Sequence, residues 1–250
     1  MTACVNIDMG KQVIVSSEPE LPVGAKFHEG VAAKWAQGYA GGSFGRRLAR
    51  FRGLLDGNVL TGTNWLDLGC GSGVLTIELL DRGAIVVAVD GSPAMLSAAQ
   101  ANVSTEHANA VTWLQCDVQT LPQLADSTFD GLLCSSVFEY LERPQAALAE
   151  AERLLRPGGK LILSLPPKRS IVRTLQKFVR KIAQLFGGNK FAYLAVSKFE
   201  VEPNHLRDWL DATGFVLDHV TKFDPLLPRG LLRFLSPALL IAEAHKKSDQ

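Results

Sequence analysis

The stretch that decides the fold of this 250-residue chain is Leu66-Asp67-Leu68-Gly69-Cys70-Gly71-Ser72-Gly73. The short apolar segment 64–68 predicts a strand, and the apolar periodicity over 74–81 predicts a helix directly after the glycines. Glycine adopts positive φ angles and lets a backbone approach a ligand closely. Three alternate glycines between a strand and a helix therefore predict a site where a nucleotide-like ligand meets the backbone.

Strands and helices alternate along the chain on the C-terminal side of this loop. The expected strands are 64–68, 84–89, 111–115, 129–134 and 160–165, followed by two closing strands at 216–223 and 239–245. Continuous apolar strands separated by amphipathic helices imply a parallel sheet that is covered on both faces. The predicted fold is α/β and doubly wound, with ligands outside the carboxyl ends of the strands.

The length of the chain suits one domain with a large core. We expect a flexible N-terminal arm over 1–26 and a single domain over 27–250. Within the domain, the pattern predicts four segments. They are N-terminal helices that form a cap (27–62), a ligand-binding core (63–167), an amphipathic helical insertion or lid (168–198), and a closing helix with strands (199–250).

Composition excludes several classes of function. The formal net charge is +1, so the chain as a whole has no electrostatic attraction to nucleic acid or to an anionic membrane. No apolar run reaches the roughly 18 residues that span a bilayer, and residues 1–23 do not resemble a signal peptide, which predicts a cytoplasmic protein. Four cysteines, Cys4, Cys70, Cys116 and Cys134, form no C-x-x-C pair, so we expect neither a disulfide framework nor a metal site.

Acidic residues follow the first three strands of the core, and they restrict the class of ligand that the predicted site can hold. Val74 stands where the dinucleotide pattern G-x-G-x-x-G has its third glycine, and no Gly-Lys-Ser/Thr follows to form a P-loop. Asp90, 21 positions after Gly69, can accept hydrogen bonds from both hydroxyls of a ribose. Asp117 can accept a hydrogen bond from the amino group of an adenine, and Val118 would lie against the adenine ring. Together with Asp67, these residues predict an adenosine site without a phosphate clamp.

In their order along the chain, these motifs resemble those of the class I S-adenosylmethionine-dependent methyltransferases. The motifs are Leu66–Gly73, Val89–Ser92, Cys116–Val118, Phe129–Asp130 and Leu155–Gly159. The resemblance covers about residues 27–165 and extends more loosely to the closing strands. It implies S-adenosylmethionine as cofactor and a seven-stranded, mostly parallel sheet whose last strand is antiparallel.

The resemblance also implies roles for individual residues. Gly69 and Gly71 would approach the methionine part of the cofactor, and the backbone of Ser135 would contact it. Lys34 resembles a basic residue that reaches the methionine carboxylate in related quinone O-methyltransferases, and Tyr39 would close over the same end. The predicted cofactor-binding set is Lys34, Tyr39, Asp67, Gly69, Gly71, Gly73, Asp90, Asp117, Val118 and Ser135.

Methyl transfer by in-line displacement depends mainly on proximity and orientation, although an acceptor hydroxyl can also need a general base. The candidates for that base are Glu139, Tyr140, His28 and His205. Related ubiquinone O-methyltransferases carry acidic residues and a histidine after strand four that are associated with a metal. This chain keeps one acid there and has Tyr140 where histidine is typical, so we expect no metal.

The acceptor must be inferred from segments outside these motifs. Residues 170–186 have one apolar helix face, no acidic residue occurs from 168 to 198, and residues 225–235 form an apolar loop. Our hypothesis is that these segments form a lid over a small, apolar or lipid-like acceptor, or rest on a membrane surface. The alternative is that the apolar face packs on the sheet while the basic face is solvated. O-methylation is the favoured reaction.

Other functions stay open at this point. A tetrapyrrole carboxyl methyltransferase is one alternative, because Arg82-Gly83-Ala84 through Asp90 resembles that group. Arginines clustered at 46–52 suggest a nucleic-acid methyltransferase, but the near-neutral charge weighs against nucleic acid as a partner. A non-catalytic cofactor-binding module and, last, a nicotinamide oxidoreductase complete the alternatives. The sequence does not indicate the oligomeric state.

Overall fold

The computed structural model describes residues 14–15, 21–57, 60–189, 191–224 and 235–248. One sheet runs through the molecule in the strand order β1-β4-β3-β2-β5-β6-β8-β7. Its strands are β1 (Ile14–Val15), β2 (Asn64–Leu68), β3 (Ile85–Asp90), β4 (Val111–Gln115), β5 (Phe129–Ser135), β6 (Leu155–Leu165), β7 (Phe215–Phe223) and β8 (Leu239–Lys246). The seven predicted strands are all present, and β8 is antiparallel to both of its neighbours, as predicted.

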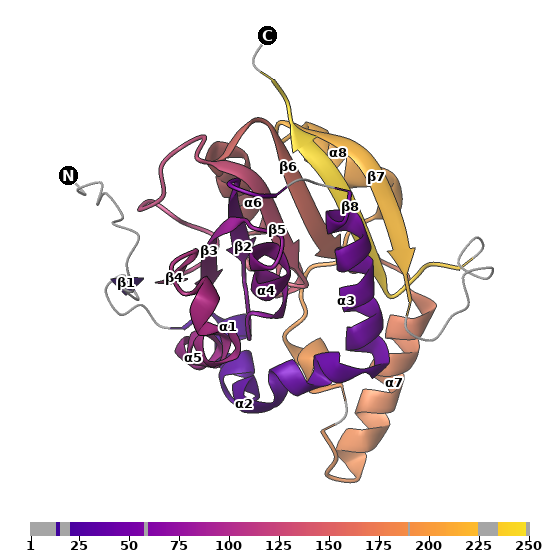
Figure 1. Cartoon of the computed structure of the whole chain (residues 1–250). Coiled ribbons are helices and arrows are strands. Elements are labelled where there is room, and N and C mark those ends of the chain that lie inside the picture. The colour runs from indigo at the N-terminus through magenta and orange to yellow at the C-terminus, as the bar shows by residue number, and fades with distance from the viewer. Residues whose placement is uncertain (1–13, 16–20, 58–59, 190, 225–234, 249–250) are drawn as a thin grey trace.

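Helices cover both faces of the sheet (Figure 1). The α-helices are α1 (Val23–Glu29), α2 (Ala32–Trp35), α3 (Gly42–Leu55), α4 (Val74–Leu80), α5 (Pro93–Asn102), α6 (Pro144–Leu154), α7 (Ile171–Leu185) and α8 (Leu206–Asp211). Short 3-10 helices are η1 (Ala36–Ala40), η2 (Thr105–His107), η3 (Phe138–Tyr140), η4 (Ala192–Ala195) and η5 (Pro203–His205). The doubly wound α/β class is therefore confirmed.

Alternation along β2 divides the interior into two cores. Leu66 and Leu68 pack with α6 and α8 on one face, whereas Trp65 packs with α3 and α4 on the other. Each of these three side chains is at most 2% exposed. Because both faces of the strand are buried, its ends rather than its faces are available to a ligand.

Three features of the fold differ from the predicted elements. The two-residue strand β1 pairs with β4 and forms the edge of the sheet. It lies within the segment predicted as an arm, most of which lies outside the described residues. Strand β6 begins at Leu155 and includes the predicted turn 156–159, because a register shift in β5 between Phe129 and Gly131 accommodates the extra residues. Helix α1 also begins four residues before the predicted cap, at Val23.

Helix α7 follows β6 and extends away from the sheet (Figure 1). Most of its apolar residues are exposed: Leu175 is 53% exposed and Phe178 60%, whereas Val172 is buried. The full exposed stripe is Ile171, Leu175, Phe178, Ile182, Leu185 and Phe186. Within the part of the chain that the structure describes, no helix is long and apolar enough to cross a membrane.

Candidate active site

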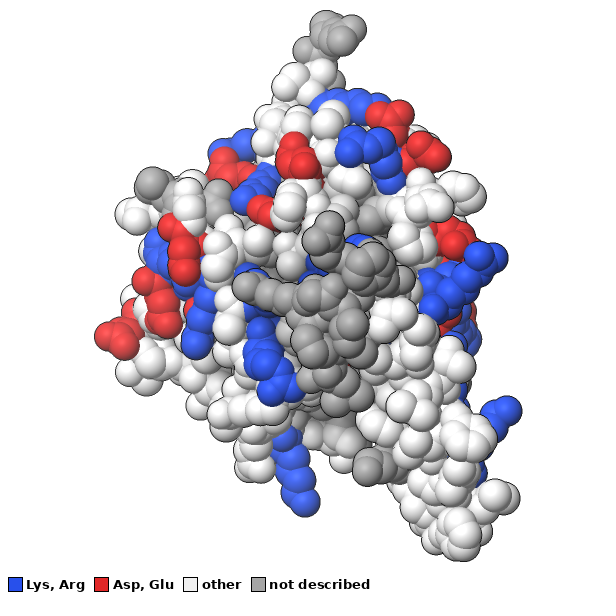
Figure 2. All heavy atoms as spheres, turned by 90° about the vertical axis from the view of Figure 1, so that its right-hand side faces the viewer, with Lys and Arg blue, Asp and Glu red and all other residues white. Residues whose placement is uncertain are grey.

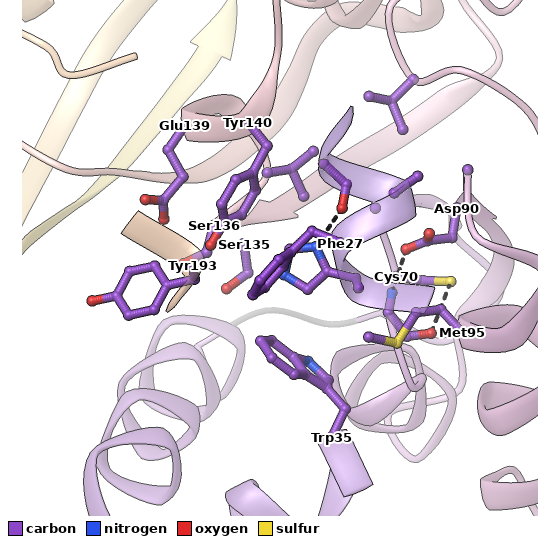
Figure 3. Close-up of a pocket in the computed structure, with 18 of the residues that line it drawn as sticks. Phe27, Trp35, Cys70, Asp90, Met95, Ser135, Ser136, Glu139, Tyr140 and Tyr193 are labelled. Carbon is purple, nitrogen blue, oxygen red and sulfur yellow. Dashed lines mark hydrogen bonds between the residues drawn. The ribbon is translucent and has the colours of Figure 1, made fainter. Parts of the chain in front are cut away.

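A cavity of about 810 Å³ lies at the carboxyl ends of the central parallel strands. Its floor is formed by the residues that follow β2, β3, β4 and β5, and its roof by α1 to α3. Helices α7 and η4 complete one end, where Figure 3 shows Tyr193 of η4. The sheet changes winding direction between β2 and β5, the position where doubly wound folds bind their ligands.

The glycine loop after β2 has the backbone that the sequence predicts. Gly69 and Gly71 have φ angles of +73° and +54°, and both line the cavity. A Cβ on Gly69 would overlap Cγ2 of Val137, and the positive φ of Gly69 also favours glycine. Gly73 does not line the cavity; it is the N-cap of α4 and lies against Ala99.

Asp90 holds this loop through its carboxylate. Oδ2 accepts a hydrogen bond from the Gly71 N–H and Oδ1 accepts one from the Ser92 N–H, both at 2.8 Å. Burial raises the pKa of Asp90, while these two backbone hydrogen bonds oppose the rise. Each oxygen keeps a lone pair for a further donor, as binding of two adjacent hydroxyls would require.

Glu29 supports the same corner from α1. Its carboxylate accepts hydrogen bonds from the Ser92 hydroxyl at 2.7 Å and from the Ala94 N–H at 3.2 Å. These contacts place a negative charge at the N-terminus of α5 and fasten the roof of the cavity to its floor.

The two other strand-end acids are engaged by neighbouring side chains. Asp67 is 1% exposed and accepts a hydrogen bond from the Thr76 hydroxyl at 2.6 Å. Burial raises the pKa of Asp67 to about 7. The carboxylate of Asp117 accepts from the N–H and the side-chain amide of Gln119, and Val118 is buried beside it on the cavity wall.

Arg47 is a cavity residue that the sequence analysis did not select. From α3 it donates to the Ser136 hydroxyl at 2.8 Å and to the Tyr39 hydroxyl at 2.7 Å. Among the described residues, its buried Nε has no partner, and neither does the buried hydroxyl of Ser135. These two groups lie on the wall of the cavity and can bind a polar ligand.

Lys34, the predicted cation, is exposed on α2 and lies outside the cavity lining. The spacing of Arg47 from two apolar residues of the same helix indicates that its side chain faces inward. It stands four and eight positions before Phe51 and Leu55, which are both fully buried, so it belongs to the inward face of α3.

Three of the four candidate bases line the cavity, and the fourth, His205, is exposed on η5. His28 donates from Nδ1 to the Gly24 carbonyl at 2.7 Å, so its neutral form carries the lone pair on Nε2. Tyr140 packs edge-on against His28, and burial raises its pKa well above the usual value. Glu139 is 3% exposed and is paired with Arg173 of α7.

Cys70, Cys116 and Cys134 are buried and free, and Cys4 lies outside the described residues. The same part of the chain contains no group of three or more His, Cys, Asp or Glu side chains that could hold a metal ion. Metal-free transfer stays a prediction.

Comparison with known proteins places this site in a family. Residues 66–163, which contain the glycine loop, Asp90 and Asp117, match the family model described as a methyltransferase domain. The ubiquinone biosynthesis O-methyltransferase of Coxiella burnetii is 27% identical over 168 residues, which cover 65% of this chain and 67% of that protein. The chain carries a methyltransferase domain with the class I, Rossmann-like fold.

Solved structures share the fold of this methyltransferase. Magnesium protoporphyrin IX methyltransferase from Synechocystis PCC 6803, with bound S-adenosylhomocysteine, superposes with a TM-score of 0.66 at 24% identity, covering 90% of this chain and 98% of that one. The cyclase SpnF superposes with a TM-score of 0.68 at 17% identity, and the match covers 95% of this chain and 100% of that one. The fold therefore accompanies methyl transfer to different acceptors and also a different reaction.

The residues of the cavity fit S-adenosylmethionine. The exposed backbone at Gly69 and Gly71, the carboxylate of Asp90 and the unpartnered groups of Ser135 and Arg47 complement a ligand with an amino acid end and a ribose. The methyltransferase activity and the cofactor predicted from the sequence are confirmed.

The raised pKa of Asp67 predicts a pH dependence of stability. The unfolded chain loses this proton near pH 3.8 and the folded chain near 7, so the unfolded state binds fewer protons between these values. The free energy of unfolding should therefore fall as pH rises through this window, and Asp67→Asn should remove that fall. Urea unfolding at about pH 4.5 and about pH 8 should show Asp67→Asn gaining a few kcal/mol relative to wild type at the higher pH.

Asp208→Asn removes an exposed carboxylate on α8 and serves as the control. It should leave the pH dependence of the wild type unchanged. An Asp67→Asn variant whose free energy of unfolding changes with pH as that of wild type does would contradict the raised pKa of Asp67.

Proposed function

We propose that this methyltransferase transfers a methyl group to an oxygen atom of a small, apolar acceptor. The observation that carries the proposal is the composition of the cavity wall outside the residues assigned to the cofactor. Apolar side chains contribute much of this wall, among them Leu141, Phe191, Ala192, Phe223 and Leu239. The similarity to proteins named ubiquinone biosynthesis O-methyltransferases supports oxygen as the methylated atom.

Several residues are assigned to the cofactor in this proposal. Asp90 binds the ribose hydroxyls, Asp117 and Val118 hold the adenine, and the Gly69–Gly71 backbone meets the methionine part. S-adenosylmethionine supplies an activated methyl group, so the protein contributes alignment, which is worth up to about 7–11 kcal/mol in favourable cases.

His28 is the base that this cavity supports best. Its Nδ1–H is committed to Gly24, which leaves Nε2 able to take the proton of an acceptor hydroxyl. Tyr140 and Glu139 are then parts of the acceptor wall, because the first retains its proton and the second is paired with Arg173. His205 receives no role, since it lies on the surface.

Labelling would test the reaction and the acceptor class together. Wild-type protein is incubated with methyl-labelled S-adenosylmethionine and a chloroform–methanol extract of the source cells. We expect label in the organic phase that is stable to alkali, because ethers resist alkali and methyl esters do not. Volatile label released by alkali would indicate a carboxyl acceptor, and label confined to nucleic acid would also contradict the proposal.

Arg47 is proposed to bind the methionine carboxylate in place of Lys34. Hydrogen bonds to charged groups contribute about 1.5–3 kcal/mol each, so Arg47→Met should weaken S-adenosylhomocysteine binding by about tenfold or more. Lys34→Met should change it less than about twofold, and Arg47→Lys should restore part of the affinity. Calorimetric titration measures all three variants, and a loss confined to Lys34→Met would reverse the assignment.

We also propose that residues 170–186 contact a membrane surface. The exposed stripe of α7 is apolar, and Lys177, Arg180 and Lys181 lie on the same helix, in a segment without acidic residues (Figure 2, lower part). An apolar face bordered by cations matches an anionic lipid surface, where each basic residue near the surface contributes about 1 kcal/mol.

Vesicle co-sedimentation tests this contact. Wild type should bind phosphatidylglycerol vesicles more strongly than phosphatidylcholine vesicles, and the triple variant Leu175→Ser, Phe178→Ser, Ile182→Ser should lose binding. Val216→Ser removes an exposed apolar side chain from β7 and should bind like wild type. Equal, negligible binding by wild type and the triple variant would refute membrane contact.

A further inference from the structure

A buried polar bridge joins α7 to the segment that follows β5. Arg173 is 5% exposed and Glu139 3%, and both guanidinium Nη atoms donate to Oε2 of Glu139 at 3.1 Å. The Ser197 hydroxyl accepts from Arg173 at 2.6 Å and donates to the same carboxylate oxygen at 2.7 Å. Charges buried this deeply are tolerated only when they are paired and hydrogen-bonded, so the two segments must stay together for either residue to remain inside.

The bridge is also the main attachment of α7 to the protein. Of the fifteen residues of this helix, Val172 and Arg173 are the buried ones. Nε of Arg173 lies 3.4 Å from Glu200, which Lys177 reaches at 2.8 Å. The inward side of the helix therefore depends on one arginine, while its apolar side is exposed.

The same arginine reaches the acceptor end of the cavity. Arg173, Glu139 and Gln176 all line it, and Gln176 accepts a hydrogen bond from the hydroxyl of Tyr193 at 3.1 Å (Figure 3 shows Glu139 and Tyr193 at this end). The three hydrogen bonds to the Glu139 carboxylate all fall on Oε2. Oε1 is thus left to accept from a hydroxyl group in the cavity.

We propose that Arg173 is a positioning residue for the acceptor. It fixes the carboxylate of Glu139 and the inward side of α7, so that Glu139 Oε1 can accept a hydrogen bond from a hydroxyl of the acceptor other than the one that His28 deprotonates. The cofactor residues lie on other elements and do not depend on this bridge. The inference rests on the proposed methyl transfer to a hydroxyl group and adds to it the residue that couples the insertion to acceptor binding.

The test separates acceptor binding from cofactor binding and from turnover. Arg173→Met and Arg173→Lys are assayed with labelled S-adenosylmethionine over a dilution series of the chloroform–methanol extract. Arg173→Met should raise the half-saturating amount of extract about tenfold or more and change the maximal rate much less. S-adenosylhomocysteine affinity should stay within about twofold of wild type, and Arg173→Lys should recover part of the lost acceptor affinity.

Arg153→Met is the matched control, because it removes another arginine from a carboxylate pair, with Glu150 of α6, outside the cavity. It should leave half-saturation unchanged even if thermal stability falls. Equal losses of acceptor affinity, cofactor affinity and maximal rate in Arg173→Met would show a structural role only and overturn the inference. Absence of any labelled product with wild type would instead refute the proposed function.

Discussion

Two backbone N–H groups converge on one carboxylate, and the site depends on that convergence. Asp90 accepts from Gly71, which follows β2, and from Ser92, which precedes α5. The first hydrogen bond fixes the glycine loop against the end of β3, and the second fixes the start of α5. Glu29 then attaches α1 to the same Ser92 side chain. The contacts of Asp90 and Ser92 therefore position the floor of the cavity, its glycine loop and its roof.

The constraint behind this corner is a sheet buried on both faces. With Leu66 and Leu68 in one core and Trp65 in the other, the central strand is buried from residue 65 to residue 68. Polar function is confined to the strand ends, where Asp67, Asp90 and Asp117 lie at increasing distance from the centre of the sheet. Burial raises the pKa of both Asp67 and Asp90, and the hydrogen bonds that each carboxylate accepts oppose the rise.

The sequence predicts features that depend on residues close together in the chain. Strands β2 and β4 have the predicted bounds, because each is an apolar run of a few residues that is ended by its immediate neighbours. The acids after the strands follow from the same pattern. Arg47 was grouped with its basic neighbours, because net charge does not show which arginine faces inward. The Glu139–Arg173 pair joins residues 34 positions apart, and no local periodicity relates them. Nor could the helical pattern of 170–186 show that its apolar face would be left exposed.

Part of the cavity is formed outside the segment that defines the family. The methyltransferase domain match covers residues 66–163, whereas the cavity roof comes from residues before it and the Arg173 wall from residues after it. The shared core holds the cofactor in one place, so its residues carry no information about the acceptor. This division explains how a porphyrin methyltransferase and a cyclase can share one fold with this chain. In this chain α7 brings to the cavity wall an arginine that already holds a carboxylate.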